Sequence, residues 1–514
     1  MGVNICRKPN IEMLKSVETG DADFMKDWCA KRCEKLDTVL EAIAALPKAH
    51  TALHLVKKCA SSCKVVHLAR TTPQAYIEPL LAHFDRSQKH AVESITGLSL
   101  NETQWKQAQL PIIGRGDLSR GHAAGGLGLR SISKTACAAY IASRKSSANP
   151  AAAVYPAYDR LGGSHFDAAV SALRPVMPEI ELQNIRSEQK HISQRQLTAY
   201  IEGASFDELS VGACPADRAR LLAYSAPWSD GWLKVTPTDV FDTLLSNSEL
   251  RDTVALRLGV ETFSDLSYCP FCSSVMDLQG HHCLACVAGG DHVVQHNEVR
   301  NTVHREAAKA NMRPELEKAG LLNDLGWPGA AGRRPADTLL VNGACVAVTS
   351  RRRYMKVALD FAVVSPFGVG AIRAASAEVL ATAKAYTETK RSYKNTQRLC
   401  EEADIGFEPI VFESTGGLEP EGQQILESIL AEVAKATGRT KADVIARVKG
   451  RISIDLCRAQ SRAIRRRREK MSCTPDVRPT IERTVLESIL EEPPLESRTE
   501  GYGATSAFRD IRLS

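Results

Sequence analysis

The sequence predicts a multidomain α+β protein: a mostly helical N-terminal half, then a short metal-binding segment and a small α/β core. Three observations lead to this class. Apolar residues recur at helical spacing through most of the first 265 residues, and cysteines and histidines gather at 269–286. Two aliphatic runs, 338–341 and 357–364, have the composition of buried strands. With 514 residues, the chain is long enough for two to four domains.

The composition is that of an ordinary globular protein. Hydrophobic residues make up 44% of the chain and charged residues 25%. The sequence contains no apolar run near the roughly 20 residues of a membrane span and no signal-peptide core. The fifteen cysteines are therefore expected to be reduced thiols, several of them buried or metal-bound, in a nuclear or cytoplasmic protein.

The net charge of +6 is modest, but the arginines are clustered. Runs stand at 351–353 and 465–468, whereas Glu491, Glu492 and Glu496 form an acidic stretch. Clustered arginines suit contacts with nucleic-acid phosphates; the alternative is a solvated helix face. The candidate nucleic-acid-binding residues are Arg351, Arg352, Arg353, Arg465, Arg466 and Arg467.

The helical half carries few chemical motifs. An apolar stripe at helical spacing runs from Leu36 to Leu46, and Pro47 ends it. The glycine-rich stretch 114–128 has neither the Gly-Lys-Ser/Thr of a phosphate-binding loop nor a GxGxxG that opens a helix. We interpret it as a turn before a helix, and residues 145–165 as a linker.

The cysteine–histidine segment predicts a zinc site. Cys269 and Cys272, with two residues between them, supply one ligand pair. The second pair is open: Cys286 is joined by Cys283 in a four-cysteine site, or by His282 in a site of three cysteines and one histidine. Ordinary core or surface residues rarely place so many soft ligands this close together. A structural zinc would contribute about 10 kcal/mol of apparent binding energy to a segment that has almost no apolar core.

Two separated acids predict a second metal site. Asp337 precedes one strand-like run, and Asp360 lies inside the other. A carboxylate among aliphatic side chains is costly unless it is paired, hydrogen-bonded or metal-bound. Two acids on adjacent strands could hold Mg²⁺, with Lys384 or Lys390 on the next helix close enough to neutralise phosphate charge. The alternative is a strand-end aspartate that pairs with a nearby arginine.

Downstream of Asp360, the pattern predicts a long helix over 370–403, a strand over 407–412 and an amphipathic helix that includes 425–433. The final forty residues, with their prolines and charges, are expected to be mostly disordered.

The order of the motifs resembles the C-terminal part of non-LTR retrotransposon reverse transcriptase polyproteins. The motifs are Cys-Pro-x-Cys, His-x-x-x-Cys, Gly-Gly, His-Asn-x-x-Arg, Arg-Pro-Ala-Asp and Leu-Asp-Phe-Ala-Val-x-Ser-Pro. They are similar to a zinc knuckle followed by a restriction-endonuclease-like domain of the PD-(D/E)xK type. Upstream, Arg70-Thr-Thr-Pro73, Trp105 with Leu110-Pro111, and the stretch 125–131 look like the thumb and linker that follow a reverse transcriptase palm.

The resemblance covers roughly residues 1–470 and implies an organisation. It places a thumb-like helical region at 1–145, a helical linker region at 146–265, a zinc knuckle at 266–290, a nuclease domain at 291–470 and a tail at 471–514. It implies an endonuclease that nicks target DNA to expose a 3′-hydroxyl for target-primed reverse transcription. The implied partners are DNA and template RNA.

The resemblance also assigns residues. It carries structural zinc to Cys269, Cys272, His282 and Cys286, and catalytic Mg²⁺ to Asp337 and Asp360, with Glu315 as an additional upstream acid. The resemblance assigns the basic residue of the nuclease site to Lys384, and Lys390 and Tyr393 follow it along the chain.

Three positions depart from the family pattern. Ala362 stands where PD-(D/E)xK nucleases usually carry a lysine two residues after the acid, so a lysine on the helix must substitute. Gln295 and Asn301 stand where the family tends to carry a basic residue and an aspartate.

The sequence also lacks the Asp-Asp dipeptide that polymerase chemistry needs. We therefore expect the chain to begin after the palm and not to polymerise DNA. The alternative function is a catalytically inactive, zinc-containing nucleic-acid-binding remnant, and a third is a helical protein whose cysteines are incidental.

Overall fold

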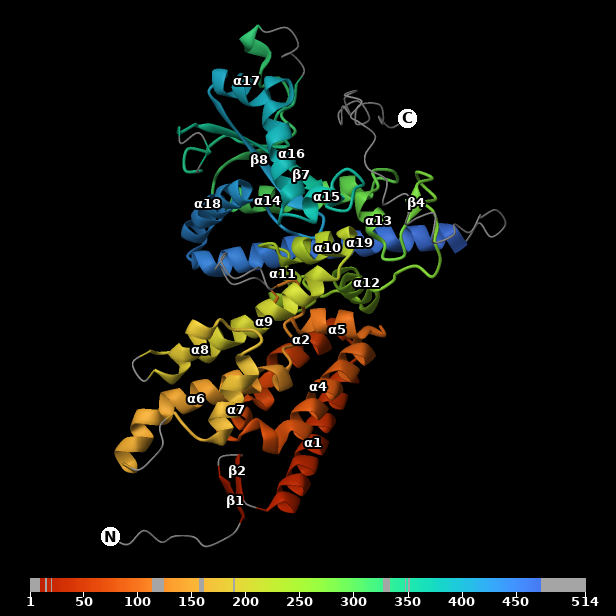
Figure 1. The fold of residues 1–514 in the computed structure, drawn as a ribbon. Coiled ribbons are helices and arrows are strands. Elements are labelled where there is room, and N and C mark those ends of the chain that lie inside the picture. Colours follow the sequence, from red (N-terminus) through yellow and green to blue (C-terminus); the bar gives the residue numbers. More distant parts are fainter. Residues whose placement is uncertain are drawn as a thin grey trace.

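The computed structural model describes residues 10–472, apart from 14–15, 20, 113–123, 157–160, 188–189, 327–332, 347 and 350–351. The tail predicted at 471–514 therefore lies, from residue 473 on, outside the described residues. The chain is mostly helical with small sheets, as the α+β class predicts. Helices of the N-terminal half gather at one end of an elongated molecule, and the largest sheet lies at the other (Figure 1).

The N-terminal body buries one apolar core, to which Leu53, Leu81 and Phe84 contribute fully buried side chains. The apolar stripe from Leu36 to Leu46 falls mainly on its first helix, where Leu36 and Leu40 are buried. The elements of this body are β1 (Asn10–Met13), β2 (Ser16–Thr19), α1 (Ala22–Ala44), α2 (Ala49–Cys59), α3 (Val66–Thr71), α4 (Gln74–Thr96), α5 (Glu102–Gln109) and α6 (Ile132–Val154).

Helix α6 passes through the boundary predicted between 145 and 146 and occupies much of the predicted linker. The helix continues across Pro150, and Ala148 and Ala152 on either side of the proline are buried. A second core, which includes Phe166, Leu173 and Ile185, lies between α6 and the three helices that follow. The helices that follow α6 along the chain are α7 (Ser164–Leu173), α8 (Glu179–Arg186), α9 (Gln194–Val211), α10 (Pro215–Ser225), α11 (Gly231–Lys234) and α12 (Asn247–Leu258).

The C-terminal half contains a mixed four-stranded sheet with the order β5-β6-β7-β8. Strand β6 is antiparallel to both β5 and β7, and β8 runs parallel to β7. The strands predicted over 338–341, 357–364 and 407–412 are confirmed. The strands are β5 (Pro314–Leu316), β6 (Thr338–Leu340), β7 (Lys356–Val364) and β8 (Ile405–Glu413).

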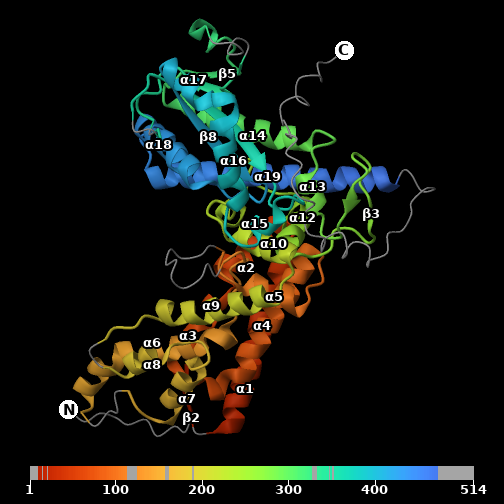
Figure 2. The same ribbon diagram turned by 45° about the horizontal axis from the view of Figure 1, so that its top comes forward.

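Helices cover both faces of this sheet (Figure 2). Leu359 and Phe361 of β7 face one core, shared with α14 (Asp291–Lys309) and α18 (Pro420–Thr437). Ala358 and Ala362 face the other side, where α16 (Ala381–Ser392) and α17 (Thr396–Glu402) pack. The alternation along β7 therefore directs Asp360 toward α16.

The single long helix predicted over 370–403 is wrong. The segment forms α15 (Ile372–Ala375), α16 and α17, with left-handed backbone at Leu380 and again at Lys394 and Asn395. These positions interrupt the helical hydrogen bonds, because an L-residue in the left-handed region cannot continue a right-handed helix.

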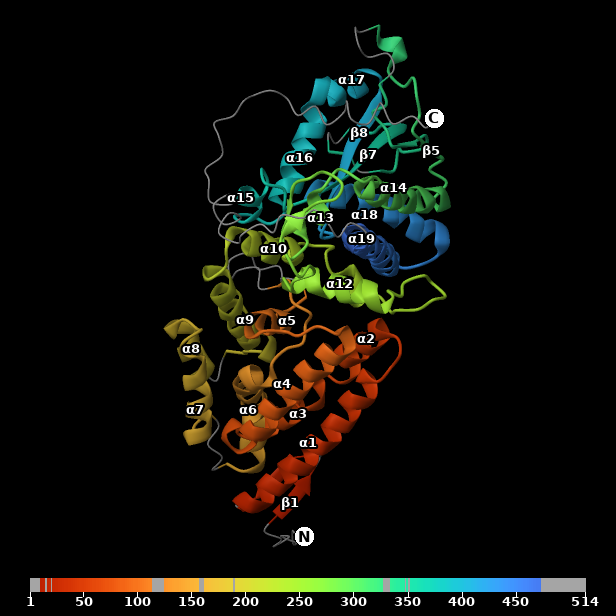
Figure 3. The same ribbon diagram turned by 90° about the vertical axis from the view of Figure 1, so that its right-hand side faces the viewer.

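Helix α19 (Lys441–Ser472) lies between the two halves of the molecule (Figure 3). Its 32 residues span about 48 Å at the usual helical rise. Ile454 enters the N-terminal core, Ile452 enters the sheet core, and Ile464 packs against the cysteine–histidine segment. One helix thus joins all three parts. No described helix is both long and apolar enough to cross a membrane.

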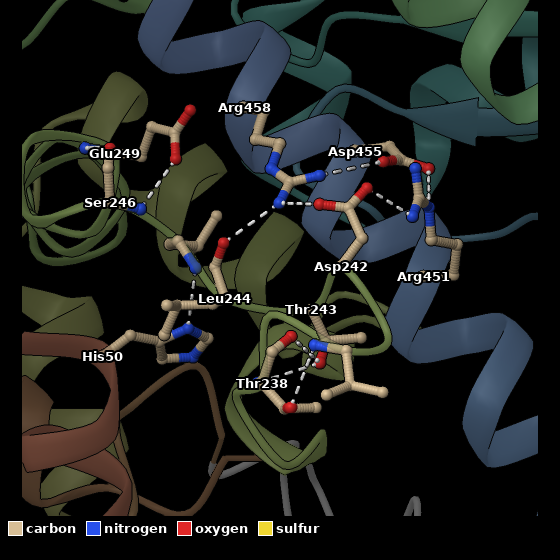
Figure 4. A network of polar contacts seen from close by, with 12 residues as sticks. His50, Thr238, Asp242, Thr243, Leu244, Ser246, Glu249, Arg451, Asp455 and Arg458 are labelled. Carbon is tan, nitrogen blue, oxygen red and sulfur yellow. Dashed lines mark hydrogen bonds and ion pairs between the residues drawn. The ribbon is translucent and has the colours of Figure 1, made fainter. Parts of the chain in front are cut away.

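A loop between α11 and α12 is tied to α19 by charge (Figure 4). Asp242 accepts hydrogen bonds at 2.6 Å from both Arg451 and Arg458 of α19. Asp455 pairs with Arg451 at 2.8 Å. On the other side of the loop, His50 of α2 accepts a hydrogen bond at Nδ1 from the Leu245 amide, 3.1 Å away. Its Nε2 lies 3.3 Å from the Trp232 carbonyl, so the ring is a neutral tautomer that donates from Nε2.

We expect His50 to make folding sensitive to acid. The side chain is 2% exposed, and burial lowers its pKa from 6.5 to about 4. Because the unfolded chain protonates this group first, stability present above pH 6.5 is lost as the pH falls toward 4, by up to about 3 kcal/mol. Urea titrations of the wild type and His50→Asn between pH 4 and 7 test this. The variant should show the smaller pH dependence, and parallel curves would contradict the prediction.

Candidate functional site

Four candidate metal ligands converge on one point. Cys269 and Cys272 flank a tight turn after strand β3 (Ser267–Tyr268), and this strand pairs with β4 (Val275–Met276). His282 lies on α13 (His281–Ala285), and Cys286 follows that helix. The ligand atoms of the four residues all lie within 4.8 Å of one another.

The distances suit a tetrahedral ion. Cys269 Sγ and Cys286 Sγ are 4.0 Å apart, and Cys272 Sγ is 3.3 Å from His282 Nε2. Ligands at usual zinc bond lengths stand about 3.5–3.8 Å apart at the corners of a tetrahedron. Three sulfurs and one imidazole nitrogen are also a donor set that zinc favours. The cluster could therefore hold a metal ion.

The geometry separates His282 from its neighbour Cys283. Cys283 is 2% exposed and packs in the apolar core of this segment, outside the ligand cluster. Burial raises the pKa of its thiol, and its sulfur is not among the four ligand atoms that gather. His281 is also buried and stacks on Phe367, with ring centroids 4.2 Å apart. Of the two ligand sets that the sequence spacing left open, the structure brings together the one with three cysteines and His282.

The arginines of α19 pack on this segment. Arg466, Arg467 and Lys470 surround the ring of Phe271, with cationic groups 5.0, 5.0 and 4.7 Å from its centroid. Arg466 and Arg467 bond to Asp291 at 2.7 and 3.1 Å.

The prediction that Arg467 binds nucleic acid is therefore wrong for this conformation. Its side chain is fully buried, and its guanidinium is committed to Asp291 and lies within hydrogen-bond reach of Cys269 and Cys286. Arg465 is 55% exposed and lies near Glu469, so it can still meet a partner. Arg466 is intermediate, with 31% of its side chain exposed.

The run 351–353 lies at the sheet end. Arg352 and Arg353 are exposed, and Arg352 bonds to Asp404 at 2.7 Å. Arg351 lies outside the described residues.

The second predicted site brings Asp337 and Asp360 together. The Asp337 amide donates to the Leu359 carbonyl at 3.0 Å, one step beyond the Thr338–Leu359 pair of β6 and β7. The Asp337 carboxylate accepts a hydrogen bond from the Phe361 amide at 2.7 Å. Asp337 and Asp360 lie within hydrogen-bond reach of each other. Two carboxyl groups thus meet at adjacent strand positions.

Lys390 is the lysine that reaches these acids. Its Nζ lies 3.0 Å from both carboxylate oxygens of Asp360. Lys384, which stands two turns earlier on α16, bonds instead to Glu378, and 42% of its side chain is exposed. The structure therefore places Lys390, and not Lys384, at the acid pair.

Glu315 does not join the acid pair in the described contacts. It pairs with Lys318 at 2.8 Å and stands opposite Leu339. Glu317 is the neighbour of Asp337 across the strands, since its amide donates to the Asp337 carbonyl at 3.1 Å.

One residue of the site was not predicted. His296 of α14 places Nε2 3.0 Å from Asp337 Oδ2. The motif His-Asn-x-x-Arg contained the signal, because it puts His296 and Arg300 one turn apart on one helix face.

The two acids differ in their affinity for a proton. Burial raises the pKa of Asp360 to about 7, against the attraction of Lys390. Burial would also raise the pKa of Asp337, but the hydrogen bond and charge of His296 hold it below its ordinary value. Asp337 is thus the acid that loses its proton first, and Asp360 retains a proton to higher pH. Such a pair, with a lysine at hand, could bind a divalent cation through carboxylate oxygens.

A search of protein families and of curated proteins found no match to this chain.

Proposed function

We propose that this protein is a Mg²⁺-dependent DNA endonuclease derived from a non-LTR retrotransposon. It would nick target DNA for target-primed reverse transcription, without polymerase activity of its own. The observation that carries the proposal is the meeting of Asp337, Asp360 and Lys390 where β6 begins beside the middle of β7. The mixed sheet with helices on both faces is compatible with the restriction-endonuclease-like core that the motifs imply.

The residues of the acid pair fit Mg²⁺. Hard carboxylate oxygens are the ligands that this ion prefers, and a cation between two adjacent carboxylates relieves their mutual repulsion. Asp337 and Asp360 would hold the ion. Bound Mg²⁺ would polarise a phosphoryl oxygen and lower the pKa of a bound water.

The reaction would be hydrolysis of one phosphodiester bond. A water oxygen bonds to phosphorus while the bond from phosphorus to O3′ breaks, and a proton passes to O3′. The products are a 3′-hydroxyl and a 5′-phosphate. Lys390 would neutralise negative charge that develops on the phosphoryl group.

The cysteine–histidine cluster would hold a structural zinc. All four protein ligands close the coordination sphere, which is typical of structural and not catalytic zinc. Among the described residues, Arg352, Arg353 and Arg465 are the exposed candidates for phosphate contacts.

Nicking of supercoiled plasmid tests the function. We expect the purified protein with Mg²⁺ to convert supercoiled DNA to the open circle, and EDTA or Asp360→Asn to abolish this. Fluorescence anisotropy with labelled duplex DNA should show that Asp360→Asn still binds. If the wild type binds DNA but never nicks it, and Asp360→Asn behaves identically, the alternative of an inactive nucleic-acid-binding remnant gains the support.

A further inference from the structure

We propose that His296 is a positioning residue of the acid site, which fixes the Asp337 carboxylate so that one oxygen remains available to a divalent cation. This inference rests on the proposed function. It adds His296 to the residues of the proposed nuclease site, and the contacts of His296 define its role.

The backbone of Asp337 is fixed on both sides. Its amide donates to the Leu359 carbonyl of β7 at 3.0 Å, and its carbonyl accepts from the Glu317 amide at 3.1 Å. The residue therefore has no freedom to move along or across the sheet. The orientation of its side chain is then the remaining variable in the geometry of the site.

The side chain is held at a single oxygen. Asp337 Oδ2 accepts from the Phe361 amide at 2.7 Å and faces His296 Nε2 at 3.0 Å. Neither contact uses Oδ1. Because two donors occupy Oδ2, the rotation of the carboxylate is fixed, and Oδ1 is the oxygen left for a cation shared with Asp360.

The imidazole is itself held in place. Its Nδ1 lies 3.3 Å from the Asn297 side-chain oxygen, and the ring is 26% exposed. One turn further along α14, Arg300 bonds to Glu317 at 2.8 Å. One face of α14 thus contacts both the side chain of Asp337 and the neighbouring strand segment that holds its backbone. Outer partners of this kind orient metal-binding carboxylates, and their loss typically costs 10–100-fold in metal affinity or activity.

The test compares His296→Ala with His296→Gln, whose amide keeps an N–H donor. Fe²⁺ replaces Mg²⁺, and ascorbate with peroxide then generates radicals that cut the protein backbone beside the bound iron. Mass spectrometry of the fragments reports occupancy near residues 337 and 360 without any DNA cleavage. In parallel, nicking is measured against Mg²⁺ concentration. His304→Ala is the matched control, because His304 lies on the same helix and its Nδ1 has no hydrogen-bond partner in the described part of the chain.

We expect His296→Ala to raise the half-saturating Fe²⁺ and Mg²⁺ concentrations at least tenfold. His296→Gln should restore most of the affinity, and His304→Ala should match the wild type. An unchanged metal dependence in His296→Ala would overturn the inference. The inference would also be overturned if His296→Ala and His296→Gln lost metal affinity equally and had equally lowered thermal unfolding midpoints. That result would mean that His296 only stabilises the fold. The proposed function fails separately if iron cuts the wild type at this site and the His296 variants shift its half-saturation as expected, but neither the wild type nor any variant nicks DNA.

Discussion

Cys286→Ala is expected to release the bound metal and to unfold the segment 266–290. The segment's own elements are short, since its two strands have two residues each and α13 has five. Structural zinc contributes about 10 kcal/mol or more of apparent binding energy in small elements, which exceeds what such short elements supply alone. Metal content by mass spectrometry and limited proteolysis of the purified protein measure the two effects.

The loss should extend into α19. Ile464 packs against the segment, the Arg467 guanidinium lies 5.0 Å from the Phe271 ring centroid, and Arg466 bonds to the Gly289 carbonyl at 2.7 Å. When the segment unfolds, the C-terminal turns of α19 lose their cover, so hydrogen exchange should rise there and not near Val444, which packs in the sheet core.

Cys283→Ala is the matched control, since it removes a neighbouring thiol that lies outside the ligand cluster. We expect it to keep one equivalent of zinc and to cost only a modest loss of packing. If Cys283→Ala loses the metal while His282→Ala retains it, the four-cysteine alternative is correct.

The parts of the fold that the sequence predicted are those set by local pattern. The aliphatic runs became β6 and β7 because alternate side chains enter cores on both faces of the sheet. The amphipathic spacing around Ile425 and Val433 became α18. Ligand spacing likewise brought four zinc candidates together, because turns of two residues have few conformations.

The rest depended on contacts between distant segments. The arginine run of α19 has the same sequence whether its side chains face solvent or pair with an acid. Arg467 is buried because Asp291, 176 residues earlier, pairs with it. His296 likewise meets an acid 41 residues further on. No periodicity within either segment specifies the partner.

The identity of the active lysine shows the same limit. A continuous helix over 370–403 would put Lys384 and Lys390 on different faces, but the sequence does not show which face meets Asp360. The break at Leu380 sets where α16 begins, and with it the face that meets Asp360. Lys384 lies on another face of the same helix and pairs with the exposed Glu378 instead.

These two lysines provide the sharpest test of the acid site. Lys390→Met is expected to lower the single-turnover nicking rate by a factor of about 10²–10³, because it removes the one amine at the acid pair. Lys384→Met should change the rate less than about twofold, since its partner is a surface glutamate and exposed ion pairs contribute little. Rates are measured at saturating DNA and Mg²⁺, so that a change in binding does not enter.

Removing Lys390 also leaves Asp360 without its counter-charge, and folding must be checked separately. The pKa of Asp360, already about 7, should rise further without the lysine, so the carboxyl can take up a proton and avoid a buried unpaired charge. The variant should therefore remain folded, with thermal melting as the measurement, and Lys390→Arg should recover part of the rate because it keeps a positive charge. Loss of nicking in Lys384→Met with Lys390→Met unaffected would mean that the contacts around Asp360 are structural. The amine that serves the reaction would then lie on the opposite side of α16, where Lys384 could reach a phosphate only by leaving Glu378.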